Sequence, residues 1–169
     1  MTDPADPHIL GPGLLPTPFS ADEIRAGCPA GRTIRIRIER DGEVVGWRVN
    51  RWGEGDDEGA TLHSQRFDAH GEPLAEPDVS RVTWADLQGH ASFEAARTVR
   101  QPAVIDSPMG QLQGLHYQRT EDDGSISDFW FASSMPGMPI RYRSVVDGRV
   151  TNETFVVENR LPGAVGSGA

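Results

Sequence analysis

Hydrophobic and polar residues alternate most clearly on either side of the pair Asp41-Gly42. Isoleucines alternate with charged residues over 33–40, and apolar residues keep the same period over 45–49. A period of two is typical of strands with one buried face, and an Asp-Gly pair favours a two-residue hairpin turn. Such a turn predicts a hairpin in which the apolar residues of both strands share one face. The expected pairs are Ile38 with Val45, Ile36 with Trp47, and Ile34 with Val49.

Similar segments recur along the rest of the chain, separated by clusters of glycine, proline and aspartate. Turn signals about every eight to twelve residues are typical of antiparallel meanders. We therefore predict an all-β fold with minor α content, either a curved antiparallel sheet or an open β-barrel. Residues 126–133 carry three aromatic residues in a row, which predicts a central strand covered on both faces. The other expected strands are 60–68, the edge segment 74–82, 98–105, 111–120, 140–146 and 150–158.

Two short helices are expected beside the sheet. Ser20, followed three residues later by Glu23, has the spacing of a capping box and predicts a helix over 21–26. Thr83 is a suitable N-cap for a second helix, from residue 84 to about residue 89. Helices of about two turns need tertiary contacts to form, so both are expected to pack across the sheet.

The length of 169 residues suits one domain with a substantial core. Prolines interrupt the beginning of the chain and glycines are frequent at its end. We therefore expect an extended arm (1–18), a single β-rich domain (19–160) and a flexible tail (161–169). The first thirty residues lack the pattern of a signal peptide, and no stretch approaches the roughly 20 apolar residues that cross a bilayer. The sequence thus predicts a soluble, cytoplasmic protein.

The charged residues exclude several classes of function. All 16 basic residues are arginine, and with 25 Asp and Glu the formal charge is −9. Without lysine, Schiff-base and phosphate-loop chemistry are excluded, and an acidic chain does not suit nucleic acid. Cys28 follows a helix end and is expected to be a small buried residue rather than a nucleophile. The histidines lack the spacing of a metal site. We expect no metal and no nicotinamide, pyridoxal phosphate or nucleotide cofactor.

Three stretches carry a resemblance to known proteins: residues 16–32 (PTPFSADEIRAGCPAGR), 83–93 (TWADLQGHASF) and 129–150 (FWFASSMPGMPIRYRSVVDGRV). Together they resemble an uncharacterised family of small bacterial β-rich proteins. The last third, with its strand, Pro-Gly-x-Pro turn and hairpin, looks like the half-barrels of lipoprotein carriers of the LolA and LppX type. The resemblance implies a half-barrel fold and a carrier role, and no active site comes with it. Such carriers are exported and often lipidated, whereas this sequence shows neither pattern.

Three residues are candidates for acid–base chemistry: Asp86, His90 and His116. Asp86 and His90 are four residues apart, so on a helix they would share a face, where the carboxylate would raise the basicity of the imidazole. Alternatively, His90 only ends the helix and packs beside Trp84. His116 shares a strand face with Gly114, which would leave room for a ligand. The alternative is an exposed or hydrogen-bonded strand histidine.

Large aromatic side chains are numerous for a small sheet, and most of them are expected in the core. A curved sheet with a helix at its mouth also commonly encloses an apolar cavity for a small molecule. Trp84 is either part of this mouth or part of the core, and the apolar segment 135–139 is either its rim or a plug. Arginines that alternate along 33–40 and 140–146 are expected to form a stripe facing solvent or a partner. The predicted ligand-binding residues are Trp47, Trp84, Tyr117, Trp130, Met135 and Met138.

These patterns leave three classes of function. The first is a binding protein that holds a hydrophobic small molecule on the concave face of the sheet. The second is a cofactor-independent enzyme of cyclase, isomerase or hydrolase type, acting in the same cavity. The third is an accessory subunit that binds a protein partner or a second copy through the arginine stripe and the proline-rich arm. We favour the first class because the sequence carries no strong catalytic motif. Neither nucleic acid binding nor membrane insertion is expected.

Overall fold

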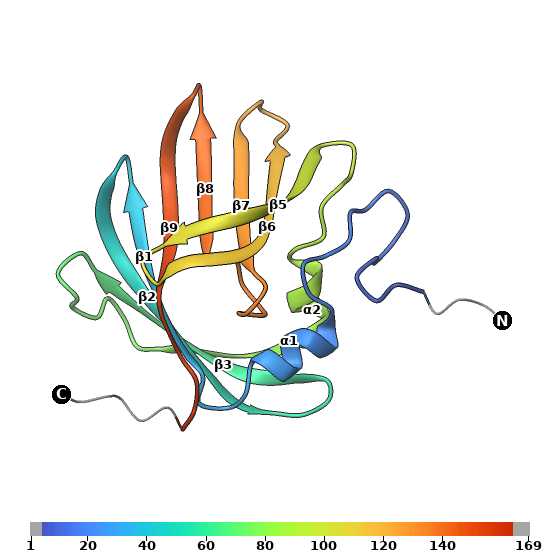
Figure 1. Cartoon of the computed structure of the whole chain (residues 1–169). Coiled ribbons are helices and arrows are strands. Elements are labelled where there is room, and N and C mark those ends of the chain that lie inside the picture. Colours follow the sequence, from blue (N-terminus) through green and yellow to red (C-terminus); the bar gives the residue numbers. More distant parts are fainter. Residues whose placement is uncertain (1–4, 164–169) are drawn as a thin grey trace.

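The computed structural model describes residues 5–163. Within them the chain forms one antiparallel sheet of nine strands, with two short helices on its concave side (Figure 1). The prediction of a mainly β fold with a curved, open sheet is confirmed. In chain order the elements are α1 (Ala21–Gly27), β1 (Thr33–Arg40), β2 (Glu43–Gly55), β3 (Gly59–Asp68), β4 (Asp78–Thr83), α2 (Trp84–Gly89), β5 (Thr98–Ser107), β6 (Gly110–Thr120), β7 (Ile126–Ala132), β8 (Arg141–Val146) and β9 (Arg149–Arg160).

Two meanders make up the sheet, and the pairing of β1 with β9 joins them. The strand order is β4-β3-β2-β1-β9-β8-β7-β6-β5, so β4 and β5 are the edges and β9 lies in the middle. The prediction that 126–133 forms the central strand is therefore wrong, because β7 is third from the β5 edge. Its expected burial on both faces is correct, since the neighbouring residues Phe131 and Ala132 are both buried. Burial alone cannot reveal strand order, which depends here on the pairing of distant strands.

The β1–β2 hairpin differs from its predicted register by one residue. Ile38 lies opposite Gly46 instead of Val45, because Val45 is an extra residue in a β-bulge. An insertion of one residue exchanges the two faces of a strand relative to its partner. The predicted pairs are therefore wrong, and Trp47 and Val49 lie on the outer face of the sheet. The observed inner-face pairs are Ile36 with Arg48 and Ile34 with Asn50.

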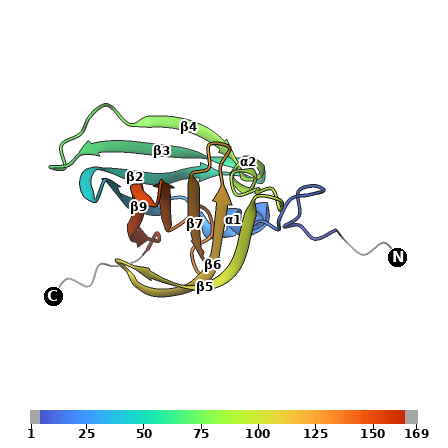
Figure 2. The same cartoon turned by 90° about the horizontal axis from the view of Figure 1, so that it is seen from above.

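Both helices begin where the sequence predicts them. The Ser20 hydroxyl accepts a hydrogen bond from the backbone of Glu23, and the Glu23 carboxylate accepts one from the backbone of Ser20, which confirms the capping box. The Thr83 hydroxyl caps α2 by accepting a hydrogen bond from the backbone N–H of Asp86. The helices contact each other, with the backbone N–H of Ala21 donating to the side chain of Gln88 at 3.0 Å. Figure 2 shows them between the β2–β4 part of the sheet and the β5–β6 hairpin.

Strong coiling brings the β5–β6 hairpin across β7, β8 and β9 (Figure 1). β6 passes so close to β7 that a Cβ atom on Gly114 would lie 1.8 Å from the carbonyl oxygen of Phe131. Ile105, near the tip of this hairpin, packs in one core with Ile36 and Val156. A second core lies beneath the helices. Its largest members are Phe19, Trp52, Trp84, Phe93, Tyr117 and Phe131.

The N-terminal segment contacts the helices and the loop that follows α2. The backbone N–H of Leu15 donates to the carbonyl of Phe93 at 2.9 Å, and Thr17 is buried. The outer parts of the predicted arm and tail, residues 1–4 and 164–169, lie outside the described residues, and the division into 1–18, 19–160 and 161–169 stays a prediction. No helix in the described part of the chain is long and apolar enough to cross a bilayer.

Candidate ligand-binding site

A cavity of about 450 Å³ lies between the inner face of β2, β3 and β4, helix α2 and the 135–139 segment. We call it the inner cavity. The two short helices lie over only part of the concave face (Figures 1 and 2). The lining residues come from β1 to β4, from α2, from β7 and from the loops that follow α1, α2 and β7. The lining residues are Cys28, Arg32, Ile34, Arg48, Asn50, Trp52, Leu62, Ser64, Asp78, Ser80, Leu87, His90, Ala91, Phe129, Phe131, Gly137, Met138 and Pro139.

One side of the inner cavity is apolar. Leu87 comes from α2, Met138 from the 135–139 segment, and Phe129 from β7, and all three are half-buried. Trp52 of β2 packs against Trp84 with ring centroids 5.8 Å apart, which holds this wall on the core beneath the helices. Apolar walls of this kind favour aliphatic or aromatic ligand surfaces, because binding removes both from water.

Polar groups enter the lining from the inner face of β2 and β3, and the bulge at Val45 directs those of β2 inward. Beyond the bulge, Arg48 and Asn50 point to the inner face of β2, next to Ser64 of β3. The Ser64 hydroxyl donates to the side-chain oxygen of Asn50 at 2.9 Å. Without the extra residue, the register would direct Trp47 and Val49 inward instead, and this part of the lining would be apolar.

Arg48 is a half-buried guanidinium without a carboxylate partner among the described residues. Its Nε is buried and finds no acceptor there. Burial, followed by the nearby charge of Arg66 on β3, lowers the pKa of Arg48. The protein thus keeps a cation in a place where its surroundings oppose the charge.

Arg32, a second arginine of the lining, is only 2% exposed. All its hydrogen-bond acceptors are neutral: it donates to the carbonyls of Gly27 and Pro136 and to the side chain of Asn159, at 2.7–2.9 Å. It also donates to the sulfur of Cys28 at 3.1 Å. These bonds connect the end of α1 to the 133–140 loop. Arg32 therefore holds these two segments together at one end of the inner cavity.

The predicted ligand-binding residues are dispersed in the structure. Met138 lines the inner cavity, whereas Met135 is buried in the core with Ile36. Trp84 and Tyr117 are 4% and 0% exposed and belong to the core beneath the helices. The hydroxyl of Tyr117 donates to the carbonyl of Pro16 at 2.7 Å.

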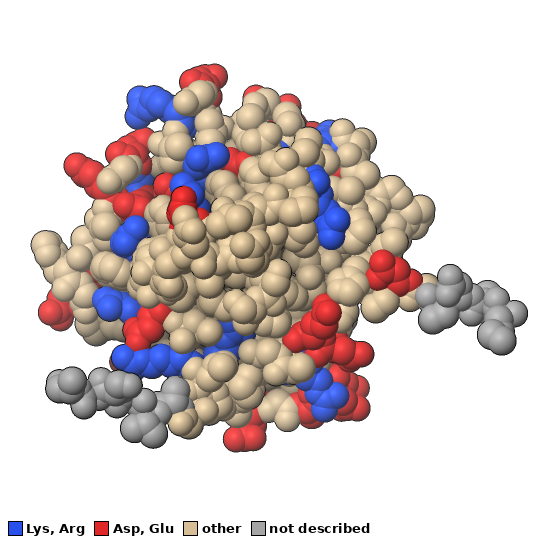
Figure 3. Space-filling view, viewed as in Figure 1, with Lys and Arg blue, Asp and Glu red and all other residues tan. Residues whose placement is uncertain are grey.

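Trp47 and Trp130, the other two predicted residues, lie on the outer face of the sheet. The guanidinium of Arg35 lies 4.3 Å from the ring centroid of Trp47, and that of Arg141 lies 4.6 Å from the ring centroid of Trp130. The predicted arginine stripe is therefore interleaved with aromatic rings, which it covers. Figure 3 shows that both signs of charge are scattered over one side of the molecule, with a largely uncharged stretch across its centre.

The three candidate catalytic residues do not come together. His90 lines the inner cavity, but its only bond to Asp86 in the described structure runs from backbone to backbone, and both side chains are exposed. His116 lies on the outer face, where Nε2 is 2.7 Å from Oδ1 of Asp128. Sequence reasoning missed Asp128 because cross-strand pairing, not sequence spacing, brings the two side chains together. Among residues 5–163, no group of three or more histidines, cysteines or acids is arranged to hold a metal.

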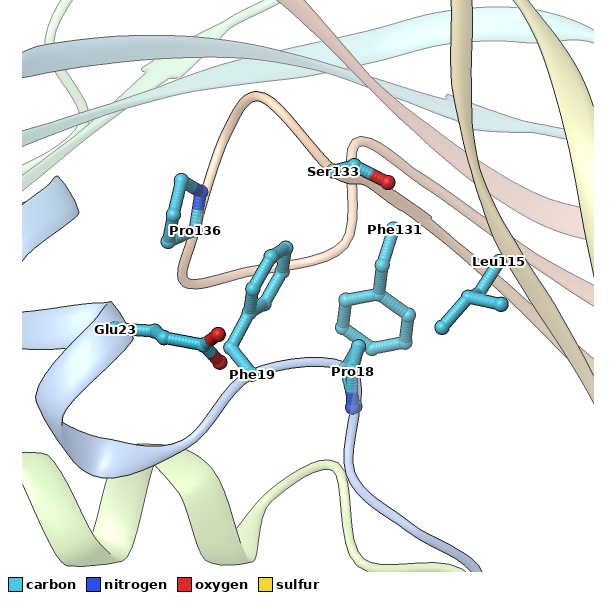
Figure 4. A pocket seen from close by; sticks show the side chains of 7 residues that line it. All are labelled: Pro18, Phe19, Glu23, Leu115, Phe131, Ser133 and Pro136. Carbon is cyan, nitrogen blue, oxygen red and sulfur yellow. The ribbon is translucent and has the colours of Figure 1, made fainter. Parts of the chain in front are cut away.

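A smaller pocket of about 210 Å³ lies between the start of α1 and the 133–136 turn (Figure 4). Phe19 and Phe131 face each other across it in an edge-on arrangement. Its one carboxylate, Glu23, is already bonded to the backbone of Ser20 and the ring of His8. This pocket therefore offers less room and fewer free polar groups than the inner cavity.

No family model matches the sequence, and no curated protein does. Among solved structures, the chain is similar to a Bacteroides fragilis protein described as exported and as having a YmcC-like fold. The TM-score is 0.52 at 9% identity, over 79% of this chain and 97% of that chain. It is also similar to a Parabacteroides distasonis protein described as a lipoprotein, with a TM-score of 0.47 at 7% identity, over 79% of this chain and 96% of that chain.

These comparisons correct one prediction and leave another open. The prediction of a cytoplasmic protein is wrong by comparison with the Bacteroides structure, because a protein of this fold is described as exported. That prediction rested on the lack of a signal-peptide pattern in the first thirty residues. Such a lack does not determine in which compartment proteins of this fold act. The Bacteroides protein is not described as a lipoprotein carrier, so the likeness of the last third to such carriers stays a prediction.

Proposed function

We propose that the protein binds a hydrophobic small molecule in the inner cavity. The observation that carries the proposal is the apolar wall formed by Leu87, Phe129 and Met138 around a space of about 450 Å³. Ligand cavities in proteins typically measure roughly 300–1,000 Å³ and combine apolar walls with a few polar groups. The occurrence of this fold in a protein described as exported supports a site of action outside the cytoplasm.

Binding of a neutral fluorescent probe, N-phenyl-1-naphthylamine, tests the proposal. Its fluorescence rises in apolar surroundings, and it can be excited where tryptophan does not absorb. In the variant Leu87→Trp the indole would fill part of the inner cavity from α2, because Leu87 lines it. We expect the unchanged protein to bind the probe and Leu87→Trp to bind it at least about tenfold more weakly, which corresponds to ~1.4 kcal/mol.

The matched control is Leu74→Trp, because Leu74 is exposed in the loop before β4 and does not line the inner cavity. Thermal unfolding of both variants verifies that each is folded. The proposal would be overturned if the unchanged protein did not bind the probe. It would also be overturned if the two variants bound the probe equally well.

A further inference from the structure

Two buried hydrogen-bond donors of the residues that line the inner cavity lack acceptors in the described part of the chain. Nε of Arg48 and the indole Nε1 of Trp52 are both buried, and neither has an acceptor among the described residues. Both residues line the inner cavity. Buried donors without partners are rare in proteins because they lose their bonds to water and gain none in return. The terminal nitrogens of the Arg48 guanidinium also make no hydrogen bond among the described residues, and they are not buried as Nε is, so a ligand that brings acceptor atoms beside Arg48 would supply partners to this guanidinium.

The charges around the inner cavity favour an anion over a cation. Two arginines line it, and Asp78 is the one acidic residue of the lining. Asp78 is exposed on the edge strand β4, opposite Ser64, whereas Arg48 and Arg32 are less exposed. Arg66 of β3 lies directly opposite Arg48 and adds a second positive charge there. The protein as a whole carries a formal charge of −9. Two arginines without a carboxylate partner among the described residues therefore make this cavity more positive than the rest of the protein.

The polar groups also lie together on one side. Asn50 and Ser64 neighbour Arg48 on the inner face of β2 and β3, while Phe129, Leu87 and Met138 line other parts of the same space. Arg32 is already bonded to neutral acceptors, which leaves Arg48 as the guanidinium available to a ligand. A molecule with one polar end and one apolar end matches this division.

We propose that the ligand is amphipathic and carries an anionic head group, a carboxylate or a phosphate, bound by Arg48. The inference rests on the proposed function and extends it to the class of ligand. The head group would accept bonds from Arg48, with Asn50 and Ser64 beside it, and the apolar tail would lie against Leu87 and Phe129. A guanidinium binds either oxyanion through parallel N–H donors.

Three unbranched ligands of twelve carbon atoms each test this proposal: dodecanoate, dodecyl phosphate and neutral dodecanol. The two anions are titrated below their micelle concentrations and dodecanol below its solubility limit, each against protein loaded with N-phenyl-1-naphthylamine, and probe displacement gives the affinity. We expect at least one of the two anions to bind about ten- to a hundredfold more tightly than dodecanol, as charge-assisted hydrogen bonds provide. The stronger of the two anions identifies the head-group chemistry.

The variant Arg48→Gln should remove this preference and leave the affinity for dodecanol within about twofold. Arg48→Met, which keeps an unbranched side chain about as long as the aliphatic part of arginine, is the second variant if glutamine disturbs the sheet. The matched control is Arg35→Gln, since Arg35 lies on the outer face of β1 over Trp47. This control should keep the full preference for the anion.

The outcomes separate the two proposals. Equal binding of dodecanol and both anions to the unchanged protein would overturn the anionic head group but keep the hydrophobic site. The same holds if a folded Arg48 variant keeps the preference. No binding of the probe or of any of the three ligands would overturn the proposed function itself. The head-group preference of the unchanged protein needs no variant, so it decides the inference even if both variants fail to fold.

Discussion

Nε2 of His116 lies 2.7 Å from Oδ1 of Asp128 on the outer face of the sheet. Asp128 is fully buried in spite of its charge, because Arg143 and Gln118 also donate to its carboxylate. The ring of His116 is stacked on Trp130 with centroids 4.5 Å apart. These bonds connect β6, β7 and β8 and stabilise their pairing on the side of the sheet opposite the inner cavity.

Asp128 should make stability depend on pH in the acid range. Burial acts to raise the pKa of this carboxyl, but its hydrogen bonds with His116, Arg143 and Gln118 lower it below its ordinary value. A carboxyl whose pKa is lower in the folded state stabilises the fold above its unfolded-state pKa, about 3.9, and loses that contribution as the pH falls through the folded-state pKa.

We therefore expect Asp128→Asn to cost about 3 kcal/mol of unfolding free energy at pH 7, with the difference from the unchanged protein shrinking below about pH 4. Urea denaturation at several pH values between 7 and 3 measures both effects. Asp57→Asn, at an exposed position, is the control and should change little. A constant difference at every pH would show that the charge of Asp128 does not matter.

Trp84 should behave as a core residue. It is 4% exposed, packs on Trp52 and donates through Nε1 to the carbonyl of Asp56 at 2.9 Å. Trp84→Ala is expected to cost about 3–5 kcal/mol, measured by chemical denaturation. Trp47→Ala, on the outer face, is the comparison and should cost less. If Trp84→Ala left the denaturation midpoint unchanged and weakened only probe binding, Trp84 would belong to the ligand site instead.

Gly114 should tolerate no side chain. A Cβ atom there would lie 1.8 Å from the carbonyl oxygen of Phe131 and 2.9 Å from Cδ1 of Ile105. Because backbone must move to relieve such a contact, we expect Gly114→Ala to cost more than about 3 kcal/mol or to prevent folding. Gly89→Ala is the control, since nothing lies within 4 Å of its Cβ position in α2, and it should stabilise by about 0.5–1 kcal/mol. Equal thermal stability of the two variants would contradict the close approach of β6 to β7 at Gly114.

Cys28 should react slowly in the folded protein. Its side chain is buried, and burial raises the pKa of the thiol more than the neighbouring Arg32 lowers it. We expect labelling by a thiol reagent at pH 8 to be slower than in denaturant by on the order of a hundredfold, because only 3% of Cys28 is exposed and its thiol is less ionised than a free one. A time course in buffer and in urea measures this ratio. Equal rates would show that Cys28 is open to solvent.

Much of the secondary structure could be predicted from the sequence. The capping box at Ser20, the N-cap at Thr83 and the hairpin turn at Asp41 depend on residues within a few positions of each other, and the structure contains all three. Local alternation likewise identified the strands, because the period of two reflects the geometry of a single strand. Of the candidate site, this reasoning reached Met138 and His90.

The polar groups of the inner cavity could not be found in this way. The prediction assumed a regular hairpin, and one extra residue at Val45 directs Arg48 and Asn50 inward in place of Trp47. Once the bulge is known, alternation along β2 identifies these residues at once. A bulge has no reliable local signal, since the whole sheet determines which face of a strand is buried.

By itself, the sequence determined that this protein is rich in β-strands, where its turns and caps lie, and which chemistries its lack of lysine excludes. These properties depend on neighbouring residues or on composition alone. Only the tertiary structure decided the strand order, the inward direction of Arg48 and the meeting of His116 with Asp128. Each of these depends on contacts between distant segments, above all the pairing of β1 with β9 and the coiling of β6 at Gly114.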